Sequence, residues 1–264
     1  MKYTLSEIIL ELERNFPPKL QEEYDNAGIQ VEAGDGNINK CLVTLDVTED
    51  VVDEAIAKEC NLIVAHHPLI FGRGLKHITK QTPVERTIIK AINHSISIYC
   101  AHTNADAMPE GTSKVMMDKI GIKDYKILLP NKKMDYPCGS GAIGDLPEPI
   151  ESKEFLLTLK KVFNCEGIRH TAIVKDKVKR IAVCSGSGSF LLSEAILQGA
   201  DVFVSGDFTY HKFFDADSRI IIADLGHFET EIGIKNVFVD ILQKKFYNFV
   251  VLKSDINTNP IKYL

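Results

Sequence analysis

The chain has 264 residues, of which 45% are hydrophobic and 25% are charged, a composition that excludes a disordered protein and allows one large or two medium domains. Its net charge is −5 and no basic run stands out, so we expect small molecules or proteins as partners rather than nucleic acid. No stretch approaches the length of apolar sequence that a membrane span requires.

The start of the chain and its cysteines predict a cytoplasmic protein. The first residues, Met1–Leu5, lack the long apolar segment and small-residue cleavage site of a signal peptide. The six cysteines are scattered without a C-x-x-C pair, and several lie in apolar runs. We therefore expect buried thiols in a reducing compartment rather than disulfides or a zinc ribbon.

The first predicted elements are a helix and a β-α-β unit. Thr4–Phe16 has apolar residues at helical spacing, a capping box at its start and two prolines after its end. The unit that follows has a strand, a helix and a strand at residues 40–46, 49–59 and 61–65. Its short crossover predicts parallel strands joined in the right-handed sense.

A second β-α-β unit begins near residue 180. Its strand, helix and strand are expected at residues 181–184, 189–198 and 201–204. A shift of 183 − 43 = 140 residues superposes the two units without a gap from Cys41 to His67, with Val43 on Val183. This self-similarity predicts an internal duplication.

The remaining segments complete a fold of two similar α/β lobes. Between the units we expect a linker, a helix and a strand at residues 132–137, 151–163 and 168–174. A last helix over residues 229–245 is expected to close the first half. The predicted first lobe comprises residues 1–124 plus 218–264 and carries most metal ligands. The predicted second lobe comprises residues 125–217.

Three predicted strands end in residue types that bind divalent metals. The apolar strand near residues 62–65 is followed by His66 and His67. The strand near residues 97–101 is followed by His102 and Asp106, and the strand near residues 220–224 by His227 and Glu231. Ligands of parallel sheets bind beyond the carboxyl ends of the strands. We therefore predict that the three strand ends meet around one metal centre.

The expected ligands differ in chemistry. His66 and His67 would point to opposite faces of a flat strand, but Pro68 turns the backbone there, so each histidine can serve a different ion of a close pair. Asp106 and Glu231 are carboxylates able to bridge two ions about 3.5–4 Å apart. Glu231 could instead be an acid at a helix N-terminus.

Two further histidines have more than one possible role. His102 either binds metal or holds Asp106 or a substrate oxygen from outside the ligand sphere. His211 follows the strand at residues 201–204 and is a candidate acid, base or substrate contact.

Two glycine-rich segments also invite interpretation. Gly139–Gly144 matches the dinucleotide fingerprint, but prolines follow where that motif needs a helix, which excludes a dinucleotide site. Ser185–Ser189 lies between a strand and a helix, and is either a phosphate-binding turn or an ordinary tight turn.

Together these motifs resemble the NIF-three-like dinuclear metal proteins, whose members also carry the name GTP cyclohydrolase I type 2 homologue. The resemblance covers nearly the whole chain. It rests on His66-His67-Pro68, on His102 to Asp106, on Ser205-Gly206-Asp207 with Tyr210-His211, on Gly226-His227 with Thr230-Glu231, and on Asp25 to Gly28 with Tyr24 where a Trp is common.

The resemblance implies an assembly and a ligand set. Its fold would be two α/β lobes related by a pseudo-dyad, assembled as a toroidal homohexamer, a trimer of dimers. Two divalent ions per chain would bind the set His66, His67, Asp106, His227 and Glu231. Such mixed histidine and carboxylate ligands fit zinc, iron or manganese.

The predicted function is that of a dinuclear metal-dependent hydrolase of a small molecule, with His102 or His211 transferring protons. For a nucleotide such as GTP, the reaction would be hydrolytic opening of the imidazole ring with release of formate. The alternative is a non-catalytic, metal-binding hexameric scaffold or regulatory partner protein.

Overall fold

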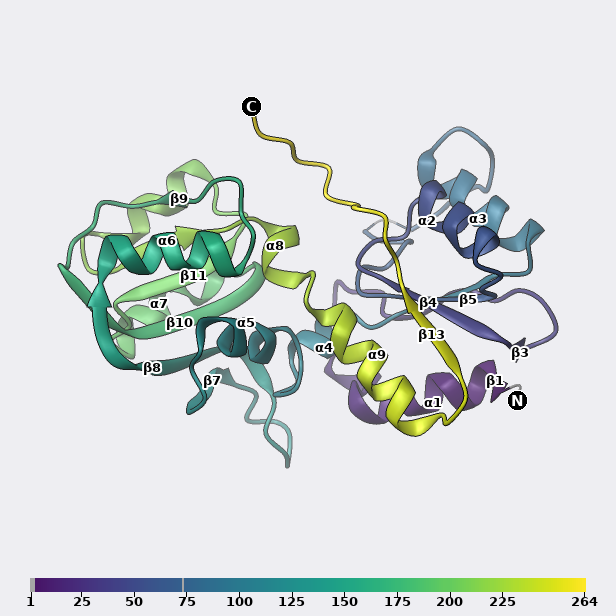
Figure 1. Ribbon diagram of the computed structural model, residues 1–264, viewed down its shortest axis with the longest axis horizontal. Helices are drawn as coiled ribbons and strands as arrows, with labels where there is room; N and C mark the ends of the chain where they lie inside the picture. Colours follow the sequence, from purple (N-terminus) through teal and green to yellow (C-terminus); the bar gives the residue numbers. More distant parts are fainter. Residues whose placement is uncertain (1–2, 73) are drawn as a thin grey trace. The chain divides into compact units, whose positions relative to one another are not determined.

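The computed structural model describes residues 3–72 and 74–264, and the chain divides into two compact units (Figure 1). Unit 1 comprises Met1–Ala105 and Ile234–Pro260, and unit 2 comprises Asp106–Gly233 and Ile261–Leu264. Each unit has its own mixed sheet, so the predicted α/β class is confirmed. Among the described residues, no helix combines the length and the apolar character that crossing a bilayer requires.

Unit 1 is built on a five-stranded sheet. Its strands are β2 (Gly28–Val31), β4 (Lys40–Thr44), β5 (Leu62–Ala65), β6 (Ser97–Cys100) and β13 (Val250–Lys253). They lie in the order β13-β4-β5-β6-β2, and all neighbours are parallel except β2, which runs antiparallel to β6. A short antiparallel ribbon joins β1 (Tyr3–Thr4) to β3 (Asn37–Ile38).

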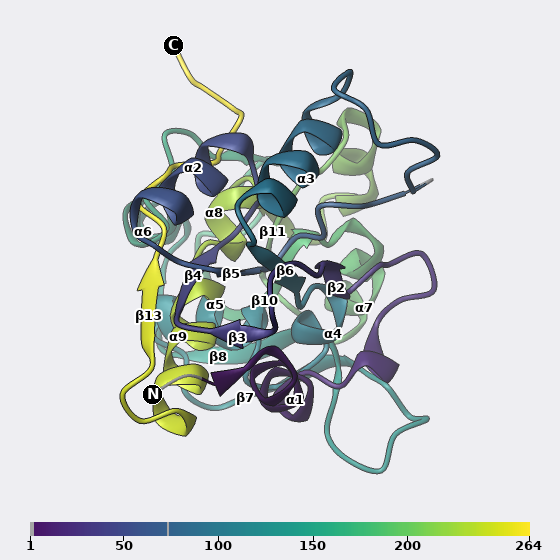
Figure 2. The ribbon, with the colours of Figure 1, turned by 90° about the vertical axis from the view of Figure 1, so that its right-hand side faces the viewer.

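Helices cover both faces of this sheet (Figures 1 and 2). On one face lie α2 (Glu49–Ala57) and α3 (Pro83–Asn93), and on the other α1 (Leu5–Asn15) and α9 (Ile234–Lys245), with η1 (Pro18–Leu20) after α1. Because strand side chains alternate between faces, Leu42, Ile63 and Ile98 share one core cluster with Val51 and Ala55 of α2. The predicted capping box at the start of α1 is present.

Unit 2 is built on a six-stranded sheet. Its strands are β7 (Tyr125–Pro130), β8 (Gly139–Glu151), β9 (Arg169–His170), β10 (Lys177–Ser187), β11 (Val202–Gly206) and β12 (Ile221–Asp224). They lie in the order β7-β8-β10-β11-β12-β9, with β10, β11 and β12 parallel and the other pairs antiparallel.

The central strands of unit 2, β10, β11 and β12, are buried on both faces. Its other elements are α4 (Thr103–Asp106, which begins in unit 1), α5 (Thr112–Ile120), α6 (Ser152–Val162), η2 (Ser189–Leu191), α7 (Leu192–Leu197), η3 (Tyr210–Ala216) and α8 (His227–Glu231). Val183 and Val204 pack with α5 and α6, whereas Ala182 and Phe203 pack with η2 and α7. This alternation explains why these strands read as continuous apolar runs.

The two sheets share the register of their central strands. Cys41 of β4 pairs with Leu62 of β5, and Ile181 of β10 pairs with Val202 of β11. Both pairs are related by one shift, since 181 − 41 = 202 − 62 = 140. The strand register that the predicted superposition requires is therefore present in both sheets.

The chain divides at other points than the predicted lobes. Residues 106–124 and 218–233, which we expected in the first lobe, belong to unit 2, because α5 packs on its sheet and β12 pairs with β11. The expected linker at residues 132–137 connects β7 to β8 within one hairpin. The apolar periodicity of residues 112–120 predicts a helix that packs on a sheet, but it does not identify which of the two sheets.

Some predicted elements also need correction. The strand expected at residues 168–174 shrinks to β9. The expected last helix is two helices, α8 and α9, and Gly233 lies between them, where a Cβ would come within 2.3 Å of Val115 Cγ1. The six cysteines are buried thiols, as predicted, and Gly139–Gly144 forms the first part of β8.

Candidate metal-binding sites

The backbone of unit 1 turns sharply where β5 ends. The N–H groups of His66 and His67 both donate to the carbonyl oxygen of Leu45, at 3.1 and 3.0 Å. Because consecutive amides on a straight strand point in opposite directions, this shared acceptor shows that the strand has already ended. The turn removes the alternation that would have placed the two side chains on opposite faces.

Three imidazoles of unit 1 converge beyond the strand ends. The ring centroids of His66, His67 and His102 are 5.0, 5.3 and 5.4 Å apart, and one nitrogen from each ring lies within 4.8 Å of the others. His66 is fully buried, and the side chains of His67 and His102 are only 20% and 14% exposed. Strands β5 and β6 are adjacent and parallel, which explains why their carboxyl ends bring these residues together.

Each of these histidines is oriented through Nδ1. The Nδ1 atom of His66 lies 2.9 Å from the carbonyl oxygen of Ala101. That of His67 lies 2.7 Å from Asp46, and that of His102 lies 2.7 Å from Asp25. An oxygen that accepts from Nδ1 places the proton there, so the lone pair of a neutral ring is at Nε2, the arrangement typical of metal-binding histidine.

The carboxylates behind the histidines are themselves held. Asp25 accepts hydrogen bonds from the hydroxyl and the backbone N–H of Thr103, and its side chain is shielded from solvent. Burial acts to raise the pKa of Asp25, but the hydrogen bonds from His102 and Thr103 outweigh it and lower the pKa to about 2. Asp46 accepts a further hydrogen bond from Thr258.

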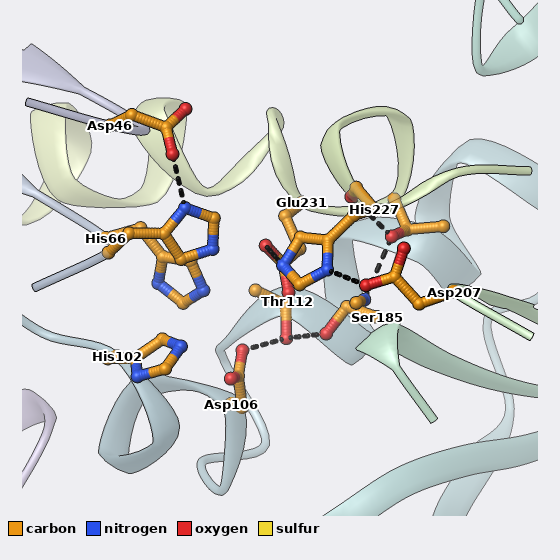
Figure 3. Close-up of polar contacts among 12 residues, drawn as sticks. Asp46, His66, His102, Asp106, Thr112, Ser185, Asp207, His227 and Glu231 are labelled. Carbon is orange, nitrogen blue, oxygen red and sulfur yellow. Dashed lines mark hydrogen bonds and ion pairs between the residues drawn. The ribbon is translucent and has the colours of Figure 1, made fainter. Parts of the chain in front are cut away.

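Unit 2 carries a second set of metal-binding side chains (Figure 3). His227 and Glu231 lie four residues apart on α8, and His227 Nε2 is 3.0 Å from Glu231 Oε2. The Nδ1 atom of His227 is 2.7 Å from Asp207, which follows β11. Burial lowers the pKa of His227, but the bonds to both carboxylates outweigh it and raise the pKa to about 11. Two carboxylates therefore flank this imidazole.

Asp106 is the second carboxylate of this set. One of its oxygens lies within 4.8 Å of an oxygen of Glu231. It accepts a 2.7 Å hydrogen bond from the hydroxyl of Thr112, which in turn accepts a 2.7 Å bond from Ser185 (Figure 3). Burial and the two carboxylates Asp106 and Glu231 raise the pKa of the Cys184 thiol beside them. The cysteine is thus a thiol, and the carboxylates supply the charge.

A glycine makes room for Glu231. Gly186 has a positive φ of 55°, and a Cβ at this position would lie 2.2 Å from Glu231 Oε1 and 3.2 Å from His227 Cε1. The Gly186 N–H also donates to Thr230 Oγ1 at 2.9 Å. The end of β10 is therefore shaped around the carboxylate and the imidazole of α8.

The predicted site residues come from both units. His66, His67 and His102 belong to unit 1, where their rings converge. Asp106, His227 and Glu231 belong to unit 2, where Glu231 lies near both of the others and in the last rather than the first turn of its helix.

The remaining predicted residues have other surroundings. His211 is exposed on η3, where its ring contacts Tyr210 and Phe214. In the Ser185–Ser189 turn, the amides of Gly186 and Gly188 already donate to the hydroxyls of Thr230 and Ser205. These bonds favour an ordinary tight turn over a phosphate site.

The role of Asp25, Asp46 and Asp207 in orienting the histidines was not predicted, although Asp25 and Asp207 lie in the motifs quoted above. Asp207 follows β11 directly and Asp46 lies two residues after β4, so the strand-end argument, applied to every strand, points to both. Asp25 lies far from His102 in the sequence, within a loop that reads as a turn, and no local pattern connects the two. Thr112 is a buried helix residue without a distinguishing signal.

Both sets carry residue types that bind divalent ions. In unit 1, one nitrogen from each of the three histidines lies within 4.8 Å of the others, and in unit 2 His227 Nε2 lies 3.0 Å from Glu231 Oε2. Imidazole and carboxylate donors favour zinc, iron or manganese.

Comparison with known proteins agrees with this description. A family model described as Duf34/NIF3 (NGG1p interacting factor 3) matches residues 3–260. A Clostridium acetobutylicum protein named GTP cyclohydrolase 1 type 2 homolog is 33% identical over 252 residues, 94% of each chain. The crystal structure of a Bacillus cereus protein related to NIF3 is similar with a TM-score of 0.90 at 25% identity, over 99% of both chains.

Proposed function

This chain belongs to the Duf34/NIF3 family, and we propose that it is a metal-dependent hydrolase with a dinuclear centre. The observation that carries this proposal is the common orientation of four histidines. In His66, His67, His102 and His227, an oxygen atom lies 2.7–2.9 Å from Nδ1. Such support is typical of histidines that bind metal through Nε2.

We propose that both units contribute to one centre. The donors of unit 1 are three imidazoles, which carry no negative charge when neutral, whereas unit 2 supplies Asp106 and Glu231. Two divalent ions need both kinds of ligand, since a carboxylate can bridge the pair and offset part of its charge. In the sequence, Asp106 lies only four positions after His102.

His102 is proposed as a ligand in addition to the five residues first expected. Its support by Asp25 is equivalent to the support of His67 by Asp46, and its ring belongs to the same triangle of imidazoles. His211 remains the proposed proton-transfer residue, because it follows the same strand, β11, as Asp207, the carboxylate that lies beside His227.

The proposed chemistry is hydrolysis. When bound, paired divalent ions lower the pKa of a water molecule and polarise the bond under attack. Asp25, Asp46 and Asp207 keep the histidines in position, and Thr112 orients Asp106. Preorganised ligands of this kind need little rearrangement during a reaction.

GTP is the first substrate to test, since the curated relative is named a GTP cyclohydrolase 1 type 2 homolog. In the proposed reaction one water adds to the imidazole-ring carbon of the base and opens the ring. A second water then releases that carbon as formate. The products are formate and a diaminopyrimidine nucleoside triphosphate.

Metal content tests the proposed centre. Protein purified without added chelator should contain about two divalent ions per chain, and Glu231→Ala should contain one or fewer. Glu148→Ala, which removes an exposed glutamate of β8, should retain both. If wild type binds none after reconstitution with zinc, iron or manganese, the proposal is wrong.

Formate release distinguishes the enzyme from a scaffold. A metal-loaded hydrolase of GTP should release formate, and His211→Ala should release it more slowly at an unchanged metal content. Full metal loading without turnover of GTP or of other ring and amide substrates would favour the alternative, a metal-binding scaffold without catalysis. The proposed assembly is a toroidal homohexamer, and sedimentation as a monomer or dimer would contradict it.

A further inference from the structure

Two exposed aromatic side chains lie beside the cluster of His66, His67 and His102 in unit 1. Tyr24 is 66% exposed and Phe71 is 52% exposed. Their rings meet at 90° with centroids 6.4 Å apart. The Phe71 ring also meets the His102 ring at 86° and 5.8 Å. The aromatic pair is therefore adjacent to one of the proposed metal ligands.

Hydrogen bonds fix the loops that carry this pair. Asn26 Nδ2 donates to the Ile70 carbonyl oxygen at 2.7 Å, which joins the loop of Tyr24 to the loop of Phe71. The side chain of Gln30 strengthens the connection, because it accepts from the Ile70 N–H at 3.0 Å and donates to the Asn26 carbonyl at 2.7 Å. Preorganised aromatic side chains lose little conformational entropy when a ligand binds.

The position and shape of the pair indicate what it binds. Exposed aromatic rings attract flat, polarisable groups, because faces and edges of π-systems carry opposite partial charge. A heteroaromatic ring can stack on one of these side chains while its polar edge faces the histidines. An aliphatic or purely anionic ligand would not use the two perpendicular rings in this way.

We propose that Tyr24 and Phe71 form a stacking site for the planar heteroaromatic ring of the substrate. This proposal rests on the proposed hydrolase function, because it assigns the ring-binding part of that same site. The class of ligand is a purine or a similar fused heterocycle, held by its ring rather than by a phosphate chain. Tyr24 and Phe71 would then decide which ring is presented to the metal centre.

The absence of tryptophan from the sequence provides a direct test. In the metal-loaded protein, Tyr24→Trp introduces a single tryptophan whose fluorescence reports on ring stacking. Inosine, a purine nucleoside without phosphate, should quench it along a saturable curve. Inorganic tripolyphosphate, which has no ring, should not. The control is Tyr247→Trp, because Tyr247 is 82% exposed in the same unit and should show only weak, linear quenching.

Two variants of Phe71 sharpen the test. Combined with Tyr24→Trp, Phe71→Ala should weaken inosine binding roughly 5- to 150-fold, the range that base–aromatic stacking covers. Phe71→Leu keeps an apolar side chain without a π-system and should also weaken binding. Equal quenching at positions 24 and 247, or unchanged affinity in both Phe71 variants, would overturn the proposal.

Failure of the stacking site can be distinguished from failure of the proposed metal centre. Fluorescence measures ring binding, whereas metal analysis of the same samples measures the ions. Two ions per chain without saturable quenching would reject the stacking site and leave the metal centre intact. A mass change in sedimentation on replacing Phe71 with alanine, without loss of inosine binding, would mean that this surface contacts a second copy of the chain, and would also reject the stacking site.

Discussion

Asp207 Oδ2 lies 2.7 Å from His227 Nδ1, and the two residues follow neighbouring parallel strands, β11 and β12. Unit 1 contains the same relationship, since Asp46 follows β4 and lies 2.7 Å from Nδ1 of His67, which follows β5. In each sheet a carboxylate beyond one strand orients an imidazole beyond the next. The two halves therefore use one structural arrangement, displaced by one strand.

Removing the support of His227 should weaken metal binding without unfolding unit 2. In Asp207→Ala the imidazole loses the acceptor that fixes its orientation, and we expect a 10- to 100-fold loss of zinc affinity. Competition with a chromophoric chelator measures this. Asp215→Ala, which removes an aspartate that pairs with exposed Lys212, should bind zinc like wild type, and equal affinities in both variants would contradict the assigned role.

Gly186→Ala should displace Glu231. The added methyl would lie 2.2 Å from Glu231 Oε1, so the carboxylate has to move, and we expect the loss of at least one ion. Gly199→Ala is a matched control, because Gly199 has a φ of 74° but nothing within 4 Å of an added Cβ. Both variants should lose about 1 kcal/mol of stability or more from backbone strain, but only Gly186→Ala should lose metal, which elemental analysis will show.

Thr112→Val should destabilise unit 2 through its hydrogen bonds. The substitution removes the acceptor of the buried Ser185 hydroxyl and one hydrogen bond donated to Asp106, and we expect a loss of about 1–3 kcal/mol in the free energy of unfolding. Urea denaturation measures this loss. In the double variant with Ser185→Ala, the loss in the free energy of unfolding should be smaller than the sum of the two single losses. Equality with that sum would argue against the coupled hydrogen bonds from Ser185 to Thr112 and from Thr112 to Asp106.

Much of the fold could be predicted because local signals agreed with the tertiary structure. The capping box at Thr4, the apolar runs of the central strands and their parallel register all follow from side-chain periodicity. The assignment of α5 to a sheet could not be predicted, because Met116 and Met117 would suit either core. The shortening of the expected strand around Arg169 depends on pairing with β12, which sequence does not encode locally.

The predicted ligands share one signal, because each is a histidine or a carboxylate within seven residues of the end of a buried strand, and this signal also includes Asp46 and Asp207. Asp25 and Gly186 could not be assigned in this way. Asp25 acts on a histidine 77 residues further along the chain, and the role of Gly186 is to leave space, which a sequence pattern does not reveal.

Acid should weaken unit 1 through Glu54. Burial acts to raise the pKa of Glu54, but hydrogen bonds from the Asp255 backbone and from Lys58 and Ser254 outweigh it and hold the pKa below its ordinary value of 4.5. The folded protein therefore binds this proton less readily than the unfolded chain. The resulting stability is complete above pH 4.5 and is lost as the pH falls through the lower pKa of the folded state.

Glu54→Gln provides the comparison. The variant should be less stable than wild type at pH 7, and the difference should shrink between pH 5 and 3, as measured by urea unfolding at each pH. A difference that stays constant across this range would show that the Glu54 charge does not contribute. Glu148→Gln, at an exposed position, should follow the wild-type curve throughout.

Anomalous X-ray diffraction from crystals of the zinc-loaded protein tests the central claim most directly, because it locates the ions. We predict two peaks per chain about 3.5–4 Å apart, with the histidines of unit 1 and the carboxylates of unit 2 as their ligands. A single peak, or two peaks that each contact only one donor set at a much larger separation, would contradict a shared dinuclear centre.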